Sequence, residues 1–514
     1  MSRRVVVVGN GMAGARLVDE LARRDPHGKQ VNPLVLGAEP HAAYNRVLLS
    51  TVLAGGLSAE AITLPTPRAG IEVRRNTTVH GIDRGQRQVR CTDGDGVPSI
   101  VDYDVLVLAT GSRAWLPPLA GLCTAGGAPA AGVLAFRTVD DCVRIVAALR
   151  AGTRVVVLGG GLLGLEAARG MHARGAEVTV VHPAAYPMER QLDPGAGAVL
   201  TRVLTELGVA LRLSATAVAY RAGLVGQDVA AGRGMVLDDG SFLAADLVVV
   251  ATGVRPETTL AHDAGLAVGR AIVVDDELRS SDRRIRAIGE CAQHREAVYG
   301  MVAPAWEQAE VVADLLTGTD ATARYTGSRL VTKLKARDID LAVMGDVSAM
   351  THTDEEGIEV LNLVDPSRGR YAKLVLHADR IVGAVLLGSP EAAAAITQLY
   401  DRHAPAPSDR LGLLLGRPEA GAQEVASPAH LPGRAVLCRC NSVTKNHLVS
   451  AWRGGATTVA ALAAATRATT GCGSCTELVS GVCSWLDTSD PAPAPELIVD
   501  PQDEENTQDE VGAA

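Results

Sequence analysis

Residues 4–14 read Arg4-Val-Val-Val-Val-Gly9-Asn-Gly11-Met-Ala-Gly14, and a helical pattern follows from Ala15 to Arg24. Residues 154–164 read Arg154-Val-Val-Val-Leu-Gly159-Gly-Gly161-Leu-Leu-Gly164, followed by a helical pattern through Ala173. Each stretch combines a buried apolar strand, a G-x-G-x-x-G loop and a helix, which together indicate a dinucleotide-binding domain. The two loops start 150 residues apart, at positions 9 and 159, which is too far for a solenoid repeat. The sequence therefore predicts an α/β protein with two Rossmann-like domains.

The three glycines of each loop have different roles. The first permits a tight turn, the second lets a pyrophosphate approach the backbone, and the third lets the helix pack closely on the strand. The N–H groups at the start of the helix then face the phosphates. The predicted nucleotide contacts are Gly9, Gly11 and Gly14 in the first loop and Gly159, Gly161 and Gly164 in the second.

The strand after each loop normally ends in an acid that binds the ribose hydroxyls. In the first domain, Val35-Leu-Gly-Ala-Glu39 supplies Glu39. In the second domain the corresponding strand, residues 177–182, ends in His182 and has no acid there. Arg190 follows closely enough to meet a 2′-phosphate, or it is an ordinary surface arginine. The second nucleotide is therefore NADH or NADPH, with NADH slightly favoured.

Apolar strands that end in Ala-Thr-Gly follow each loop. The first ends at Thr110 and Gly111, and the second ends at Thr252 and Gly253. A third segment, residues 285–291 with Gly289-Glu290, is expected to return the chain to the first domain. Residues 325–387 then alternate in the manner of strands, which predicts an α+β domain. Proline and glycine cluster between residues 405 and 433, as in a linker.

Composition narrows the class of function. The 514 residues carry 58 acids and 49 bases, and eight of those acids lie in residues 488–514, which read as an acidic disordered tail. There is no basic surplus for nucleic acid, and no apolar run of about 18 residues that would span a membrane. Nine cysteines are too few for a disulfide scaffold, which favours the cytoplasm.

Four of the cysteines form two close pairs. Cys438-Arg-Cys440 is followed, after 31 residues, by Cys472-Gly-Ser-Cys475. Four thiolates in this pattern hold either one zinc ion or one [2Fe–2S] cluster, and a C-x-C pair is less usual for zinc. Asn441 and Ser442 are expected to cap the helix that follows. The other cysteines, residues 91, 123, 142, 291 and 483, are interpreted as unligated.

The two nucleotide domains and repeated Ala-Thr-Gly segments resemble the flavoprotein family of pyridine nucleotide–disulfide oxidoreductases. The resemblance implies FAD on the first domain, NAD(P)H on the second, and NAD(P)H-dependent oxidoreductase activity. The redox Cys-x4-Cys of the disulfide-reducing members is absent, and Cys91, Cys123 and Cys142 are too far apart to replace it. We therefore do not expect a disulfide reductase.

The same resemblance implies roles for particular residues. Glu290 stands where the family usually has the Asp that contacts the FAD ribityl chain. Arg46 is a candidate flavin contact, or else a surface arginine that pairs locally. Thr51 stands where the oxygenase-coupled reductases of the family usually have Lys. Glu166 either binds the nicotinamide carboxamide or is an exposed helix residue. Pro304-Ala-Trp-Glu-Gln308 is expected to start a helix whose amides face the flavin carbonyls.

Residues 438–475 resemble the bacterioferritin-associated-ferredoxin-like [2Fe–2S] domain, which implies Cys438, Cys440, Cys472 and Cys475 as its metal ligands. Over residues 1–486 the motifs, including Met188-Glu-Arg-Gln-Leu-Asp193, look like the N-terminal part of NAD(P)H nitrite reductase large subunits. The chain as a whole resembles the assimilatory nitrate reductase electron-transfer subunits, which the resemblance implies stop after the same cluster domain. The cysteine spacing of a sirohaem domain is absent, so nitrite reduction on this polypeptide is not expected.

This resemblance implies an electron-transfer subunit for a molybdenum nitrate reductase, using FAD, NADH or NADPH, and a [2Fe–2S] cluster. Three alternatives remain. One is electron donation to a separate sirohaem nitrite reductase, another is a non-enzymatic ferredoxin module that docks on an iron-storage protein, and the third is an amino-acid or opine oxidase. The glycine loop at Gly159 argues against the third.

The predicted domains follow from these assignments. The FAD-binding domain covers residues 1–150 and 247–320, with the NAD(P)H-binding domain inserted at 151–246. An α+β interface domain follows at 321–415 and a linker at 416–434. A small helical [2Fe–2S] domain occupies 435–487, and the acidic tail occupies 488–514.

Overall fold

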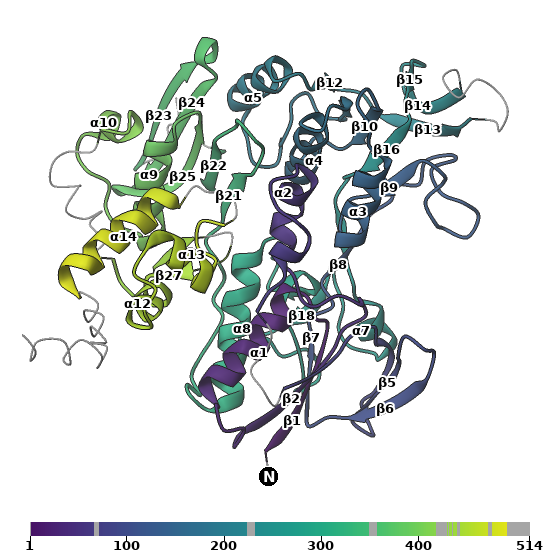
Figure 1. Cartoon of the computed structure of the whole chain (residues 1–514), viewed down its shortest axis with the longest axis vertical. Helices are drawn as coiled ribbons and strands as arrows, with labels where there is room; N and C mark the ends of the chain where they lie inside the picture. The colour runs from purple at the N-terminus through teal and green to yellow at the C-terminus, as the bar shows by residue number, and fades with distance from the viewer. Residues whose placement is uncertain are drawn as a thin grey trace, which may run out of the picture. The chain divides into compact units, whose positions relative to one another are not determined.

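The computed structural model describes residues 2–65, 71–223, 232–348, 357–417, 429, 431–433, 435–438, 441, 443–470 and 475–490 (Figure 1). The chain divides into two compact units, residues 1–424 and 425–514. The acidic segment beyond residue 490 lies outside the described residues.

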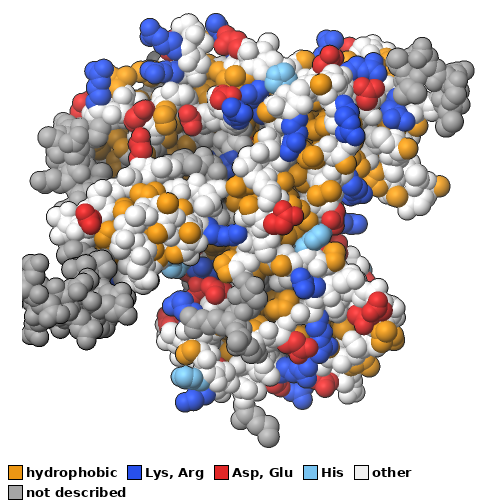
Figure 2. All heavy atoms as spheres, in the orientation of Figure 1, with side chains coloured by type: hydrophobic (Ala, Val, Ile, Leu, Met, Phe, Trp, Pro, Cys, Tyr) orange, Lys and Arg blue, Asp and Glu red, His pale blue; other side chains and the backbone are white. Residues whose placement is uncertain are grey.

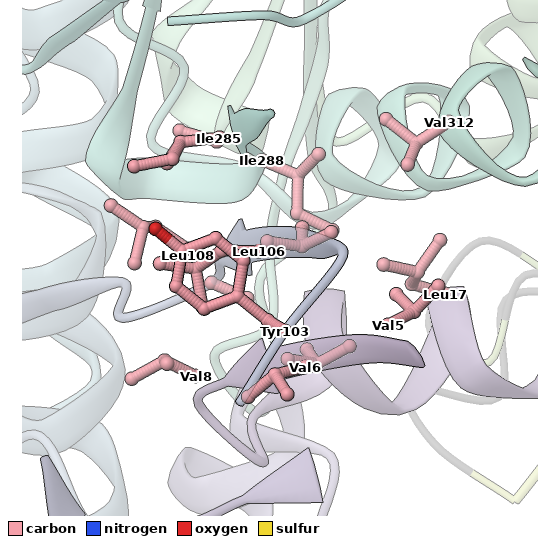
Figure 3. Packing of buried hydrophobic residues seen from close by; sticks show 14 of the residues in the cluster. Val5, Val6, Val8, Leu17, Tyr103, Leu106, Leu108, Ile285, Ile288 and Val312 are labelled. Carbon is pink, nitrogen blue, oxygen red and sulfur yellow. The ribbon is translucent and has the colours of Figure 1, made fainter. Parts of the chain in front are cut away.

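The first unit begins with a five-stranded parallel sheet, as its first glycine loop predicts. The strand order is β19-β7-β1-β2-β3, and the strands are β1 (Arg3–Val8), β2 (Val31–Leu36), β3 (Glu72–Arg74), β7 (Val105–Leu108) and β19 (Ile285–Ala287). The central strands β1 and β7 are runs of valine and leucine, as expected where both faces of a parallel sheet are covered. In Figure 3, Val6, Tyr103, Leu106, Leu108 and Ile288 pack together with Leu17 and Val312 from the helices.

Two helices cover this sheet and lie side by side in Figure 1: α1 (Met12–Arg24) and α8 (Val302–Thr317). The helix expected to start at Ala15 begins at Met12, directly after the glycine loop. Helix α8 begins at Val302, two residues before Pro304. Proline is tolerated there because the first N–H groups of a helix have no partner within the helix.

The second sheet repeats the first. Its order is β12-β11-β10-β16-β9, with β9 (Val133–Ala135), β10 (Arg154–Leu158), β11 (Glu177–Val181), β12 (Ala210–Arg212) and β16 (Leu247–Val250), all parallel. The boundaries predicted from the sequence, 151 and 246, therefore leave out two of its five strands, β9 and β16. The helices around it are α3 (Val139–Ala148), α4 (Leu162–His172) and α5 (Pro194–Glu206), and the short α2 (Leu49–Leu53) packs on α4.

Small sheets and helices complete this part of the unit. The antiparallel sheets are β4 (Thr78–Asp83), β5 (Gln88–Thr92) and β6 (Pro98–Asp102), and β13 (Ala217–Ala222), β14 (Arg233–Leu237) and β15 (Phe242–Ala244). The two-stranded pairs are β8 (Ser112–Ala114) with β17 (Val254–Pro256), and β18 (Ile272–Val274) with β20 (Ala292–His294). The short helices are η1 (Arg46–Leu48), η2 (Glu60–Ile62), α7 (Thr259–Asp263) and η3 (Gly289–Cys291).

The segment predicted to alternate as strands forms a five-stranded antiparallel sheet. Its order is β21-β22-β25-β24-β23, with β21 (Val331–Leu334), β22 (Leu341–Gly345), β23 (Ile358–Asp365), β24 (Arg370–His377) and β25 (Arg380–Leu387). Ala378 and Asp379, both with positive φ, make the tight turn between the last two antiparallel strands. The turn η4 (Pro366–Arg368) and helices α9 (Pro390–Arg402) and α10 (Arg410–Leu414) complete the α+β domain.

The second unit is small and mainly helical. It has β26 (Val436–Cys438), β27 (Val443–Thr444), α12 (Lys445–Arg453), α13 (Val459–Thr466) and α14 (Thr476–Ser489). The cap of α12 is Thr444, in a capping box with His447, so the expectation that Asn441 and Ser442 cap this helix was wrong for Asn441. Val443 and Thr444 first pair with β26, and the helix starts only after that pairing. Ser442 lies outside the described residues.

None of the described helices is both long and apolar enough to cross a membrane. On the face drawn in Figure 2, acidic and basic side chains are interspersed.

Candidate functional site

The two glycine loops have the same geometry at their first and third glycines. Gly9 and Gly159 have φ values of +115° and +110°, and a Cβ there would lie 2.2 Å and 2.5 Å from the carbonyl oxygens of Ala109 and Ala251. At Gly14 and Gly164 a Cβ would lie 2.0 Å from the carbonyl oxygen of the first glycine of the same loop. These four positions therefore require glycine for the turn and for the packing of helix on strand.

The second glycine of each loop is different. A Cβ at Gly11 or Gly161 would have no heavy atom within 4 Å. These two residues are also the N-caps of α1 and α4, and neither helix start has a side-chain cap. Open space beside uncapped helix N–H groups is what a bound pyrophosphate needs, so both loops fit a dinucleotide.

Beyond the end of β2, Glu39 lies in a cluster with the predicted flavin contact. Its carboxylate accepts a hydrogen bond from the Tyr44 hydroxyl at 2.8 Å and forms an ion pair with Arg46. The Arg46 guanidinium lies over the Tyr44 ring, 4.9 Å from its centroid. Burial, together with the nearby Glu39 carboxylate, raises the pKa of Tyr44, so this hydroxyl stays protonated and donates. Arg46 thus orients the acid predicted to bind the FAD ribose.

Glu290, expected near the ribityl chain, forms an ion pair with Arg137 and accepts a hydrogen bond from the Ser112 hydroxyl. Arg137 also donates to the Ser112 hydroxyl at 2.8 Å. Nothing in the sequence pattern singled out Arg137, because 153 residues separate it from its partner. The acid is therefore held in place by two side chains from β8 and the loop before α3.

The start of α8 meets the start of α1 in a small apolar cluster of Met12, Ala305 and Trp306. Gly289 donates its N–H to Gln308 Oε1 at 2.7 Å. The buried nitrogens Trp306 Nε1 and Gln308 Nε2 have no hydrogen-bond partner among the described residues. Buried N–H groups of this kind are costly unless a ligand or water accepts from them. An apolar cluster with unpaired donors fits the planar ring of FAD with its carbonyl groups.

Three other predicted cofactor-binding residues, Thr110, Gly111 and Gly253, lie where β8 and β17 connect the two nucleotide domains. The Thr110 hydroxyl donates to the backbone carbonyl of Glu257 at 2.8 Å, and Gly111 has a positive φ of 67°. The carbonyl of Gly253, whose φ is +108°, accepts from the N–H of Trp115 at 3.0 Å. The Ala-Thr-Gly segments thus cross-link the two nucleotide domains through β8 and β17.

Glu166 is not an exposed helix residue, so that alternative was wrong. Its side chain on α4 is only 3% exposed, and its Oε1 accepts from the Lys335 ammonium at 3.1 Å and from the Lys335 backbone N–H at 2.9 Å. Lys335 directly follows β21 in the α+β domain and is 11% exposed. This buried ion pair joins the second nucleotide domain to the α+β domain.

We expect Lys335→Met to lower the free energy of unfolding by about 3 kcal/mol, because it leaves the buried Glu166 carboxylate without its counter-charge. The double variant Lys335→Met, Glu166→Gln should recover much of this loss. Urea unfolding followed by circular dichroism measures both effects, with Lys333→Met on β21 as the matched control. Strictly additive losses in the double variant would contradict an energetic coupling between the two side chains.

Only two of the four predicted cluster ligands are described. Cys438 and Cys475 are buried, 1% and 6% exposed, while Cys440 and Cys472 lie outside the described residues. The Asn441 amide nitrogen lies 3.9 Å from Cys438 Sγ and donates to the carbonyl of Arg467 at 2.6 Å. Thiolates beside an amide donor suit an iron–sulfur cluster, whose sulfurs accept such hydrogen bonds.

Two of the remaining cysteines are buried thiols of the first unit. Cys291 is fully buried behind Glu290, its thiol donates to the carbonyls of Leu108 and Ile288, and burial raises its pKa. Burial also raises the pKa of Cys142 to about 11. Among the described residues, no three or more His, Cys, Asp or Glu side chains gather into a metal site.

Comparison with known proteins identifies the family of this chain. The pattern of the pyridine nucleotide-disulphide oxidoreductases matches residues 3–309, that of the rubredoxin NAD+ reductase C-terminal domain matches 331–403, and that of the BFD-like [2Fe-2S] binding domain matches 436–482. Among solved structures, the covalent putidaredoxin reductase–putidaredoxin complex has 28% identity and a TM-score of 0.70. The alignment covers 82% of this chain and 98% of that one.

Two curated relatives from Bacillus subtilis match nearly the whole chain. Nitrite reductase [NAD(P)H] is 36% identical over 93% of this chain and 57% of its own length. The assimilatory nitrate reductase electron transfer subunit is 33% identical over 95% of this chain and 60% of its own length. The chain thus spans about three-fifths of these relatives' own length, so each relative has further residues that this chain does not match.

The matched patterns imply FAD, NAD(P)H and a [2Fe–2S] cluster, in agreement with the cofactors expected from the sequence. The fold also agrees, with two Rossmann-like sheets, an α+β domain and a small helical cysteine-bearing unit. The chain belongs to the pyridine nucleotide-disulphide oxidoreductase family and also carries a BFD-like [2Fe–2S] binding domain.

Proposed function

We propose that this chain takes electrons from NAD(P)H and delivers them, through FAD and a [2Fe–2S] cluster, to a molybdenum nitrate reductase. The observation that carries the proposal is the matching geometry of the two glycine loops in one unit, combined with buried Cys438 and Cys475 in the other. Two nucleotide sites allow electrons to pass from one dinucleotide to another. A cysteine-ligated cluster can then pass these electrons one at a time to another protein. The cytoplasm, where thiols stay reduced, is the proposed compartment.

When bound, FAD accepts a hydride from NAD(P)H and can release the two electrons singly to a cluster that takes one at a time. The protein's residues bind and orient the groups. The open backbone at Gly11 and Gly161 receives the two pyrophosphates, and Glu39, held by Tyr44 and Arg46, receives the FAD ribose hydroxyls.

Other side chains hold the rest of the flavin. Trp306 Nε1 and Gln308 Nε2 offer buried N–H groups, and the uncapped start of α8 adds backbone N–H groups. In this proposal Glu290, which is held by Arg137 and Ser112, accepts hydrogen bonds from ribityl hydroxyls. Lys335 engages one oxygen of Glu166, and in this proposal the other oxygen accepts from the nicotinamide carboxamide.

The test is an anaerobic titration of the FAD- and cluster-reconstituted protein with NADH. Flavin absorbance and the paramagnetic signal of the reduced cluster are followed together. We expect the flavin to bleach first and the reduced [2Fe–2S] signal to follow. If the flavin bleaches but no paramagnetic cluster signal appears and the four cysteines hold zinc, the proposal that electrons leave through a [2Fe–2S] cluster is wrong.

The acceptor is tested separately. A separate sirohaem nitrite reductase is the second candidate, and the 36% identity to nitrite reductase [NAD(P)H] favours it. The reduced protein is mixed with each purified acceptor enzyme and its substrate, and re-oxidation of the flavin is timed. Rapid re-oxidation by the nitrate reductase alone supports the first candidate. Re-oxidation only by the sirohaem enzyme supports the second.

A further inference from the structure

The second nucleotide domain has no acid at the end of β11, but the loop after that strand brings one there. His182, the residue after β11, is 7% exposed in its side chain and contacts Glu189, seven residues further along. Its Nε2 lies 2.9 Å from Glu189 Oε2. The carboxylate therefore stands beside the position where an acid was expected and not found.

The backbone of this loop is anchored on the glycine loop. Met188 has a positive φ of 56° and donates its N–H to the carbonyl oxygen of Gly160 at 3.0 Å. Gly160 in turn donates its own N–H to His182 Nδ1 at 3.1 Å. A Cβ at Gly160 would lie 2.8 Å from the His182 ring, so the ring packs directly on the loop that receives the pyrophosphate.

These contacts determine which ring nitrogen of His182 carries the proton and which oxygen of Glu189 accepts it in a hydrogen bond. A backbone N–H can only donate, so His182 Nδ1 accepts and the ring proton is on Nε2. Nε2 then donates to Glu189 Oε2, which leaves Glu189 Oε1 without that bond. The Glu189 side chain is 35% exposed, so its carboxylate can be reached by a ligand.

We propose that Glu189 binds the hydroxyls of the adenosine ribose and thereby selects NADH against NADPH. The inference rests on the proposed function, because it concerns the nucleotide that reduces the protein. A carboxylate accepts hydrogen bonds from the 2′- and 3′-hydroxyls, whereas the 2′-phosphate of NADPH places a like charge against it. His182 is the positioning residue for this acid.

Arg190 is the competing feature, since a guanidinium there favours a 2′-phosphate. Its side chain is 86% exposed, and its Nε lies 4.0 Å from Glu189 Oε1. An exposed pair at this distance contributes little, because solvent screens it and the side chain is not held. Glu189 is hydrogen-bonded to His182, whose buried ring packs against the glycine loop, so its carboxylate is held more firmly than the Arg190 guanidinium.

The test measures binding, not turnover. Calorimetry on the full FAD-loaded chain uses ADP-ribose and its 2′-phosphate as probes, which contain the ribose but no nicotinamide. We expect the unaltered protein to bind ADP-ribose about 100-fold more tightly, and Glu189→Gln to reduce that ratio to near one, since hydrogen bonds to a charged acceptor and like-charge repulsion are both lost. Glu206→Gln, an exposed acid on α5, is the matched control and should leave the ratio unchanged.

His182→Phe keeps a ring on the loop but removes both hydrogen bonds. We expect it to weaken ADP-ribose binding and leave binding of the 2′-phosphate form nearly unaffected, whereas a merely structural role would weaken both. Tighter binding of the 2′-phosphate form by the unaltered protein, or an unchanged ratio in Glu189→Gln, would overturn the proposal. Probe binding without flavin reduction by NADH would contradict the proposed function and leave this assignment standing.

Discussion

Replacing Gly161 by Val is expected to abolish NAD(P)H binding while leaving the fold intact. Its φ of −79° is allowed for any residue, and a Cβ at this position has no heavy atom within 4 Å. The added methyl groups would fill the space that a pyrophosphate needs, so the N–H groups at the start of α4 lose their charge-assisted bonds. Two such bonds correspond to a loss of affinity of about 100-fold or more.

Calorimetric titration with ADP-ribose measures this loss, and thermal unfolding checks the fold. The matched control is Gly164→Ala in the same loop, where the Cβ would lie 2.0 Å from the carbonyl oxygen of Gly159. That variant should unfold at a lower temperature because α4 must move away from β10. A Gly161→Val protein that binds the nucleotide normally would contradict the role of the second glycine.

Local sequence was sufficient for those features that depend on neighbouring residues. The glycine loops require a strand, a turn and a helix within about fifteen residues, and both occur where the pattern predicts them. The central parallel strands β1, β7, β10 and β16 are equally readable, because burial on both faces favours continuous Val and Leu runs. The alternating segment after residue 325 likewise gave the antiparallel sheet, whose strands turn at residues such as Ala378 and Asp379.

Contacts between distant segments could not be predicted in this way. Lys335 meets Glu166 across 169 residues and Arg137 meets Glu290 across 153, and no spacing rule connects residues that far apart. The three residues of β9 pair with β16 at the edge of the second sheet. A strand this short has no sequence pattern of its own, so its place in the sheet depends on tertiary packing. The sequence also gave no sign that Glu189 lies beside His182, since the positive φ at Met188 turns the loop back.

The cysteine unit, residues 425–514, contains the four predicted cluster ligands. Cys475→Ala is expected to remove the [2Fe–2S] cluster and stop electron delivery to the acceptor enzyme, while NADH still bleaches the flavin. Cys475 is 6% exposed at the start of α14, so its thiolate is held away from solvent. Iron binding needs the full set of thiolates, because three ligands leave one iron site open. Loss of the cluster can also unfold this small unit, as metal binding and folding are coupled.

Cys483→Ala is the control that distinguishes loss of a cluster ligand from general destabilisation of this unit. Cys483 lies on the same helix, and its thiol is 3.8 Å from the carbonyl oxygen of Thr457, outside the predicted ligand set. This variant should keep its iron, its paramagnetic signal and its electron delivery. Flavin bleaching by NADH in the Cys475→Ala protein shows that the first unit remains intact, because both nucleotide sites lie within residues 1–424. Electron delivery that survives the loss of Cys475 would mean that the flavin reaches the acceptor directly, and the cysteine unit would then be structural.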